Sequence, residues 1–245
     1  MEAERLMVKQ KNPRNGLVSR FIFLGFFSCF FYPLYGQTSC TLTLEIRDII
    51  GPATYDYLQR GLRKAKKENC SSVLAKINTP GGSLHSTRKI VELIMNSPLP
   101  FLCVVAPAGG HAGSAGAILL QACHINGAHE ATNLGAASPV NGSGQEMSKD
   151  LRKKIFEDTR SWVESLAQFR GRNQKFARDI IVDAKAVEAK KAYEEKAIDL
   201  VFTNLPDFLE FAQGKKVRGP KEETAQQLVQ AVSYTHLTLP TNGLG

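Results

Sequence analysis

The chain has 245 residues, of which 43% are hydrophobic, so it is long enough to bury a sizeable core in one domain with appendages. Its formal net charge is +8, but the basic residues lie mostly on predicted helix faces without interleaved aromatic residues, which argues against a nucleic-acid-binding protein. The histidines and cysteines form no HExxH or CxxC pattern, and we therefore predict no metal site and no cofactor.

The first 36 residues have the pattern of a leader for export. Five basic residues against two acidic ones give residues 1–20 a local net charge of +3, and an apolar stretch follows from Leu17 to Tyr35. A basic start, a short apolar core and small residues near Gly36 are typical of a secretory signal peptide, and an uncleaved signal anchor is the alternative. The apolar run is short for a membrane span, which needs about 20 residues.

Beyond the leader, apolar periodicity predicts strands and helices that alternate along the chain. Alternating or uninterrupted apolar residues predict three strands, at 40–46, 72–77 and 101–106. Apolar residues at helical spacing predict helices at 52–69 and 84–96, and a third that begins at Ser114. This order implies right-handed βαβ units and a parallel sheet. The remaining pattern predicts helices at about 149–169, 174–182, 186–196 and 205–213, and a short strand at 198–202.

Two glycine-rich loops follow the second and third predicted strands. Both lie at the carboxyl ends of strands, where open α/β sheets usually bind ligands. In the first loop, INTPGGSLHST, the proline fixes φ and the two glycines let backbone N–H groups approach a ligand at a helix start, which suits an oxyanion. The phosphate-binding patterns GxxxxGK[ST] and GxGxxG are absent. On its own, a plain tight turn explains this loop equally well.

The second loop, GGHAGSAG, places Ser114 at the start of a predicted helix with the N–H group of Ala115 beside it. One interpretation is a structural N-cap serine. The other is a nucleophile with small neighbours, although Ala112 occupies the first glycine position of the strict GxSxG pattern. Two such loops, one βαβ unit apart, favour the second interpretation, because one can supply a nucleophile and the other can supply oxyanion donors.

Three segments of the chain resemble a known family. In chain order they are NTPGGSLHSTRKIV, APAGGHAGSAGAIL and ATNLGAASPVNGSG. They are similar, in sequence and spacing, to motifs of the NfeD-type membrane-bound ClpP-class serine proteases, within the wider ClpP/crotonase-like superfamily. The resemblance covers roughly residues 40–218 and implies a protease domain at 37–218. It also implies an α/β fold, a ClpP/crotonase-like spiral of ββα units with a mainly parallel sheet, and peptide hydrolysis by a Ser–Lys dyad.

The resemblance implies which residues form the dyad. Ser114 would be the nucleophile and Lys154, at the head of the long predicted helix, the general base, with Lys153 as the alternative. ClpP-like relatives instead carry a histidine before a proline, but the segment AASP offers none here. A lysine accepts a proton only when its amine is neutral, which calls for a closed apolar pocket. Ile155 and Phe156 are expected to supply the wall of that pocket.

The two glycine loops complete the expected site. Three backbone N–H groups are expected to form the oxyanion hole, those of Gly81, Gly82 and Ala115. Three glycines are expected to let a substrate backbone approach and pair as an added strand, namely Gly109, Gly110 and Gly113. Family members usually have MAPGTNIGAA where this chain has GAHEATNLGAA, so residues 128–131 are expected to alter a wall of the pocket.

Export would place the cysteines beyond the leader in an oxidising compartment. Cys40 opens the first predicted strand and Cys70 directly precedes the second. If these strands are parallel neighbours, both cysteines lie at the same edge of the sheet, and strands about 4.8 Å apart allow a disulfide. We therefore predict a Cys40–Cys70 disulfide, with two unrelated thiols as the alternative. Cys103 and Cys123, in an apolar strand and an apolar helix, are expected to stay buried and free.

These features favour an exported serine endopeptidase that acts on apolar segments of membrane-associated proteins, at the periplasmic or extracytoplasmic face of the cell membrane. The resemblance implies stomatin-like membrane proteins as substrates or companions, and we expect a homo-oligomer. Two alternatives stay open: a crotonase-like acyl-CoA enzyme, which would need neither Ser114 nor Lys154, and a catalytically idle scaffold for stomatin-like proteins.

The end of the chain departs from the family. Residues 219–245 are expected to be a linker followed, from about Val232, by a foreign or truncated tail. Full-length relatives often continue into transmembrane helices and a small β-barrel domain. Membrane association would therefore come from the leader or from a missing C-terminal region.

Overall fold

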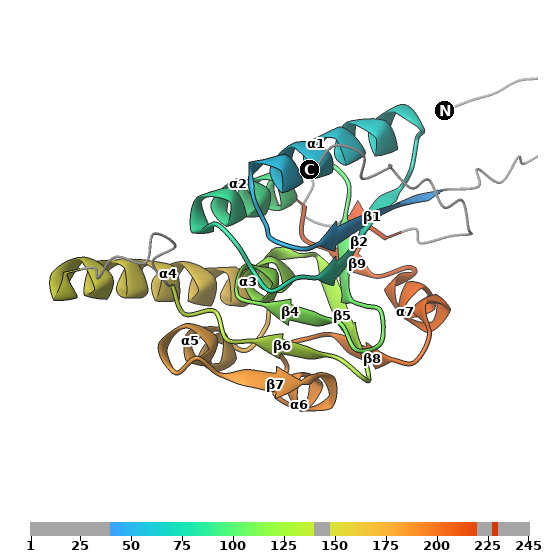
Figure 1. The fold of residues 1–245 in the computed structure, drawn as a ribbon. Coiled ribbons are helices and arrows are strands. Elements are labelled where there is room, and N and C mark those ends of the chain that lie inside the picture. The colour runs from blue at the N-terminus through green and yellow to red at the C-terminus, as the bar shows by residue number, and fades with distance from the viewer. Residues whose placement is uncertain (1–39, 140–147, 220–226, 230–245) are drawn as a thin grey trace, which may run out of the picture. The chain divides into compact units, whose positions relative to one another are not determined.

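A five-stranded sheet forms the centre of the domain. The computed structural model describes residues 40–139, 148–219 and 227–229, so the predicted leader and most of the predicted tail lie outside the described residues. The strands are ordered β1 (Thr41–Arg47), β2 (Ser72–Asn78), β3 (Phe101–Val105), β5 (Ile125–His129) and β8 (Leu200–Phe202), and every adjacent pair is parallel (Figure 1). The predicted α/β fold with a mainly parallel sheet is confirmed.

Three helices connect the first strands and cover one face of this sheet. They are α1 (Pro52–Lys67), α2 (Leu84–Met95) and α3 (Ala115–Ala122). α1 begins at a proline, whose missing N–H group is not needed in the first turn, and it buries Leu58 and Leu62 against the sheet. The long helix α4 (Lys149–Phe169) and α5 (Gln174–Val182) pack outside α3 and share the same core.

A second, three-stranded sheet holds the two glycine loops in place. It consists of β4 (His111–Gly113), β6 (Asn133–Gly135) and β7 (Ala186–Glu188), with β4 parallel to β6 and β6 antiparallel to β7. The helix predicted at 186–196 is therefore wrong in its first turn, because those residues pair with β6 and only α6 (Ala189–Glu194) is helical.

The opposite face of the central sheet is covered by α7 (Leu205–Ala212), which packs beside β8 (Figure 1). The chain continues through β9 (Lys216–Val217), which pairs antiparallel with β10 (Gln227–Leu228). Val229 is fully buried in the same cluster, so part of the predicted linker belongs to the folded domain. Among the described residues, no helix combines the length and apolar character that crossing a membrane requires.

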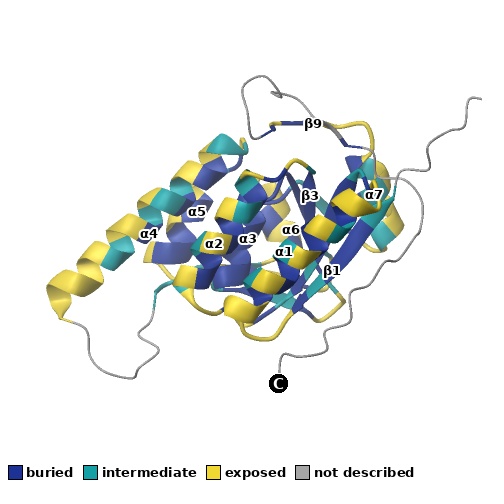
Figure 2. Ribbon diagram, turned by 90° about the horizontal axis from the view of Figure 1, so that it is seen from above, coloured by how far each residue is buried: buried dark blue, intermediate teal, exposed yellow. Residues whose placement is uncertain are grey.

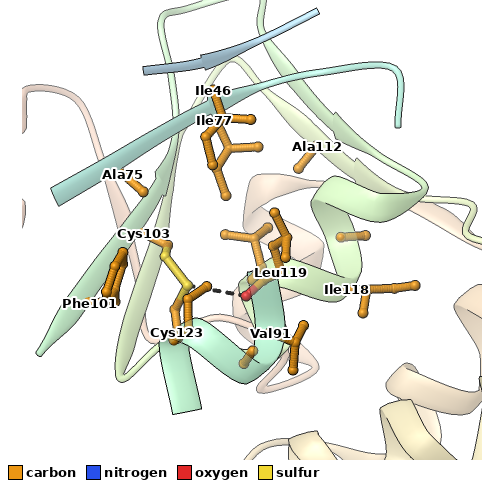
Figure 3. Packing of buried hydrophobic residues seen from close by; sticks show 14 of the residues in the cluster. Ile46, Ala75, Ile77, Val91, Phe101, Cys103, Ala112, Ile118, Leu119 and Cys123 are labelled. Carbon is orange, nitrogen blue, oxygen red and sulfur yellow. Dashed lines mark hydrogen bonds between the residues drawn. A yellow bond between two sulfur atoms is a disulfide. The ribbon is translucent and has the colours of Figure 1, made fainter. Parts of the chain in front are cut away.

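Two disulfides join core elements. Cys40 and Cys70 are bonded, with their Cα atoms 4.4 Å apart at the amino-terminal edge of β1 and β2, and this prediction is confirmed. The prediction that Cys103 and Cys123 stay free is wrong, because they form a second disulfide with Cα atoms 6.0 Å apart (Figure 3). α3 runs back along β3, so Cys123, which directly follows α3, returns to the strand that carries Cys103. Both cysteines are buried, as the sequence predicts, but the sequence pattern does not predict that they lie close together.

Candidate active site

A cavity of about 1000 Å³ lies where the two glycine loops meet. Its lining comes from the segment Pro80–Leu84, the start of α3, the extended segment Ala136–Pro139 and Ile155 of α4. Apolar side chains from several elements face it, including Ile49 and Ile118. The cavity thus brings together the carboxyl ends of two βαβ units, as the sequence predicts, and it has the dimensions of a site for a peptide segment rather than for a single ion.

Ser114 lies at a sharp turn between β4 and α3. Its φ of 47° and ψ of −113° are strained for a residue that carries a Cβ. The turn is fixed by a hydrogen bond of 2.9 Å from its N–H group to the carbonyl of Ala136. Ser114 occupies the N-cap position of α3, but its side chain makes no capping hydrogen bond to the helix, so helix capping does not explain this serine. A strained strand–serine–helix turn is the geometry that presents the nucleophile in α/β-hydrolases.

Three serines line the cavity, and their hydroxyl groups differ in what they bond. The hydroxyl of Ser83 caps α2 by accepting from the Ser86 N–H group at 3.3 Å, and that of Ser138 donates to the carbonyl of Ile181 at 2.7 Å. Within the described parts of the chain, the Oγ of Ser114 has no hydrogen-bond partner. Ser114 is therefore the serine in this cavity whose hydroxyl is free to react.

The backbone donors beside Ser114 are two rather than three. The N–H group of Gly81 donates to Oγ1 of Thr79 at 3.1 Å, so the expectation that it forms part of the oxyanion hole is corrected. Thr79 is itself held by a hydrogen bond to the carbonyl of Asp48. Among the hydrogen bonds of the described residues, the N–H groups of Gly82 and Ala115 have no acceptor. They are the donors left to bind a developing negative charge.

Lys154 does not lie in a closed pocket. α4 begins after Ser148, which caps it by accepting from the Leu151 N–H group, and Figure 2 shows the first turns of α4 largely exposed. Lys154 is one of the exposed residues. The predicted wall is formed in part, because Ile155 lines the Ser114 cavity and Phe156 packs against the core. The expectation of a closed apolar pocket around the Lys154 amine is therefore wrong for the described residues: the helix turns its isoleucine, not its lysine, toward the cavity.

The first half of α4 is tied to α2 by Arg88. Its guanidinium pairs with Asp158 of α4 and stacks 4.2 Å from the ring centre of Trp162. Asp158 lies one helical turn after Lys154, so the two share one side of α4. Arg88 thereby holds the lysine-bearing helix beside the helix whose first turn lines the cavity.

The glycines expected to bind substrate do not line the Ser114 cavity. β4 already pairs with β6 on one edge and forms a bridge to Thr79 on the other, so no edge remains for an added strand. The Gly113 N–H group donates to the carbonyl of Thr79, that of Gly110 to Pro107 and that of Gly109 to Ala131. The expectation for Gly109, Gly110 and Gly113 is corrected: their backbone groups hold the loop together.

The histidines near Ser114 in sequence lie outside its cavity. His124 is buried, and its Nδ1 accepts a hydrogen bond of 3.1 Å from the N–H group of Phe101. Burial, with the charges of Arg170 and Arg172, lowers the pKa of His124 to about 3. His129, in the segment expected to alter the pocket wall, lines a different cavity instead. Within the described ranges, no three His, Cys, Asp or Glu side chains gather as metal ligands.

Two arginines that the sequence did not single out hold the far end of α3. Arg172, with its side chain 2% exposed, donates to three carbonyls at that end and pairs with Asp199 at 2.8 Å. Arg170 donates to the carbonyl of Ala122 at 2.8 Å. The last carbonyls of a helix have no partner within it, so these guanidinium groups complete α3. The helix that begins after Ser114 is thus held by the residues that follow α4.

Comparison with known proteins places the chain in a family. The family model described as the NfeD1b N-terminal domain matches residues 42–213. Over 177 residues the chain is 28% identical to the membrane-bound protease PH1510 of Pyrococcus horikoshii, covering 72% of this chain and 40% of the relative. Over 139 residues it is 34% identical to the membrane protein NfeD1b of Bacillus subtilis, covering 55% of this chain and 30% of the relative. The chain thus spans less than half the length of these curated relatives.

Solved structures share the fold. A serine-to-alanine mutant of the 1510-N membrane-bound stomatin-specific protease matches with a TM-score of 0.75 and 24% identity, covering 83% of this chain and 98% of the other. A lysine-to-alanine mutant of the same protease, in complex with a substrate peptide, matches with a TM-score of 0.75 and 23% identity, covering 83% and 93%. With its ClpP-like fold and the match over residues 42–213, the chain belongs to the family of NfeD1b N-terminal domains.

Proposed function

We propose that this chain is a serine endopeptidase that uses Ser114 as nucleophile and Lys154 as general base. The observation that carries the proposal is the free hydroxyl of Ser114, on a strained turn beside the unpaired N–H groups of Gly82 and Ala115. Nucleophile and oxyanion donors are the two parts that acyl transfer requires in one place. They come from separate βαβ units, so a structural role for either loop alone does not explain their meeting.

The proposed reaction proceeds in two steps. The Oγ of Ser114 attacks the peptide carbonyl carbon and passes its proton to the Nζ of Lys154, while the carbonyl oxygen takes the negative charge and binds the Gly82 and Ala115 N–H groups. Collapse of this intermediate breaks the C–N bond, and Lys154 returns the proton to the leaving amine. Water then attacks the acyl-enzyme in the same way and releases the second product with Ser114 restored.

The relatives support the assignment of the base. The serine and the lysine replaced in the two 1510-N mutants are separated in their chain by nearly the same number of residues as Ser114 and Lys154 are here. Ile155, the next residue, lines the cavity, so Lys154 lies about 100° round α4 from the cavity, and its long side chain would have to reach toward Ser114. Lys153 lies farther round the helix from Ile155 and is the less suitable base.

The proposed substrate is an apolar segment of a membrane-associated protein. Apolar side chains surround the cavity, and Ile49 stands 72% exposed at its rim, where a substrate side chain would cover it. The relatives of known structure are stomatin-specific, so a stomatin-like membrane protein is the partner we propose. The two disulfides and the apolar stretch before Gly36 support an exported domain on the extracytoplasmic side of the cell membrane. That it works as a homo-oligomer is part of the same proposal.

One observation favours a second candidate, a catalytically idle scaffold. Lys154 is exposed, and no hydrogen bond within the described residues links it to Ser114. The test is incubation of the chain and its Ser114→Ala variant with a fluorogenic peptide of mostly apolar residues. Cleavage that disappears in Ser114→Ala supports the peptidase. Binding of the peptide without cleavage supports the scaffold, and turnover of an acyl-CoA that persists in Ser114→Ala supports a crotonase-like enzyme.

A further inference from the structure

A second cavity of about 430 Å³ lies on the opposite face of the central sheet from α1, α2 and α3. Its lining includes Glu45 and Lys76, whose side chains alternate with buried core residues along β1 and β2, and Phe202, a buried residue of β8. α7 covers the β5 and β8 end of this face, with Phe208 packed over Gly127, and the cavity lies beside it. The Ser114 cavity shares no lining residue with it.

Lys76 is the anomalous group in this cavity. Its side chain is only 25% exposed, yet within the described residues its ammonium makes no hydrogen bond. The nearest carboxylate oxygen, Oε1 of Glu45, is 3.9 Å away, beyond hydrogen-bond distance. The other oxygen of Glu45 is bound by Arg47 at 2.7 Å. Lys76 therefore has only a distant ion-pair partner among the described residues, and an anion beside it would add a charge-assisted hydrogen bond.

The rest of the lining fits an anion with an apolar body. Two cations share one carboxylate, which leaves the Lys76 end of the cavity with an excess positive charge. Nδ1 of His129 accepts a hydrogen bond from the Ala131 N–H group, so the neutral ring carries its proton on Nε2 and offers another donor. Opposite these groups stand apolar side chains of Phe202, Leu205 and the segment 106–108.

We propose that this cavity binds an amphipathic carboxylate, with its anionic group against Lys76 and its apolar body against Phe202 and Leu205. A fatty acid and the free carboxyl end of a peptide with an apolar last residue share this chemistry. A cavity of this size is typical of small-ligand sites. The proposal goes beyond the peptidase and does not depend on it, since neither Ser114 nor Lys154 takes part.

The test is isothermal titration calorimetry on the full chain carrying Ser114→Ala, which prevents turnover of peptide probes. Two pairs of probes are compared. The first pair is decanoate and decanol. The second is an acetylated tetrapeptide that ends in phenylalanine, with its carboxyl end either free or amidated. For at least one pair, the free carboxylate should bind about tenfold tighter than its neutral counterpart, because the charge-assisted hydrogen bond to Lys76 is lost without it. If only decanoate binds, the natural ligand is a fatty acid. If only the free peptide acid binds, the natural ligand is the carboxyl end of a peptide.

Matched variants locate the site. Lys76→Met should weaken binding about tenfold, whereas Lys66→Met, on the exposed side of α1, should leave it within about twofold. Lys76→Met should unfold at nearly the same temperature as its parent, since only the 3.9 Å ion pair with Glu45 is lost. If it fails to fold, Leu205→Glu, which places a competing carboxylate in the cavity, should abolish binding instead. Equal binding of charged and neutral probes, equal binding to Lys76→Met, or no binding of any probe would overturn the proposal.

Discussion

Gly81 lies directly against Ser114: a Cβ at position 81 would stand 2.4 Å from the Cβ of Ser114 and 3.0 Å from its Oγ. The φ of Gly81 is +122°, a conformation that other residues rarely adopt. The first glycine loop is therefore shaped around the side chain of the serine in the second. This contact is what makes the two loops one site.

Replacing Gly81 should disable that site. Gly81→Ala is expected to lower peptide cleavage about a hundredfold, because the added methyl group must displace Ser114 by a sizeable fraction of an ångström or more. Gly109→Ala is the matched control, since its φ is +77° but no atom lies within 4 Å of the added Cβ. It should cost about 1–2 kcal/mol of stability and leave cleavage nearly unchanged. Equal losses of cleavage in the two variants would mean that backbone strain alone is responsible.

Replacing Lys154, the proposed base, should affect cleavage far more than replacing its neighbour Lys153. Lys154→Ala should lower the cleavage rate about a hundredfold or more, and Lys153→Ala should keep it within about twofold, measured as kcat/KM on one apolar peptide. The wild-type rate should rise toward alkaline pH, because only a neutral amine accepts the Ser114 proton. Full activity in Lys154→Ala, or a rate that peaks in acid, would remove the lysine base from the account.

His124 should make the fold less stable in mild acid. Burial, aided by Arg170 and Arg172, lowers its pKa from 6.5 to about 3, so between these values the unfolded chain binds a proton that the folded chain does not. The free energy of unfolding should therefore decrease as pH falls below about 6.5, by at most about 1.4 kcal/mol per pH unit. Urea unfolding at about pH 7 and about pH 5 measures this difference.

Two variants isolate the contribution of His124. His124→Asn keeps a side-chain acceptor for the Phe101 N–H group and removes the titrating ring, so its stability should change less over this interval. His85→Asn, at an exposed position, should keep the pH dependence of the wild type. An unchanged pH dependence in His124→Asn would show that other groups cause the effect.

Both disulfides should be present in the folded domain. Peptide mapping by mass spectrometry without reductant should recover the Cys40–Cys70 and Cys103–Cys123 cross-links. Replacing Cys40 and Cys70 together by serine should cost about 2–4 kcal/mol, because their bond closes a loop of 30 residues in the unfolded chain. Alkylation of Cys103 or Cys123 in the denatured, unreduced protein would contradict the second bond.

The apolar periodicity of the sequence predicts the longer strands and helices of the fold. Leu42, Leu44 and Ile46 alternate with less buried residues and so define β1, and the buried faces of α1 and α2 follow helical spacing. β4, β6 and β7 were missed because each has three residues, and the first two end in glycine. Such short strands depend on pairing with one another, which a local pattern does not contain.

Some features of the candidate site follow from local sequence patterns, and others depend on tertiary contacts. Ser114 and the two glycine loops could be found because a small-residue serine turn before a helix is a local pattern. The occupied N–H group of Gly81 could not, since it depends on where the Thr79 hydroxyl points. The Cys103–Cys123 bond likewise depends on how far α3 runs back along β3. The arginines at the end of α3 left one signal, the segment GRN, but their partners lie some 50 residues away in sequence.

The role of Ser114 as nucleophile is tested most directly by labelling the protein with a fluorophosphonate probe and locating the adduct by peptide mass spectrometry. We expect one adduct on Ser114 that is absent from Ser114→Ala, because the hydroxyls of Ser83 and Ser138 in the same cavity are already hydrogen bonded. An adduct on Ser83 or Ser138, or labelling that persists in Ser114→Ala, would contradict it.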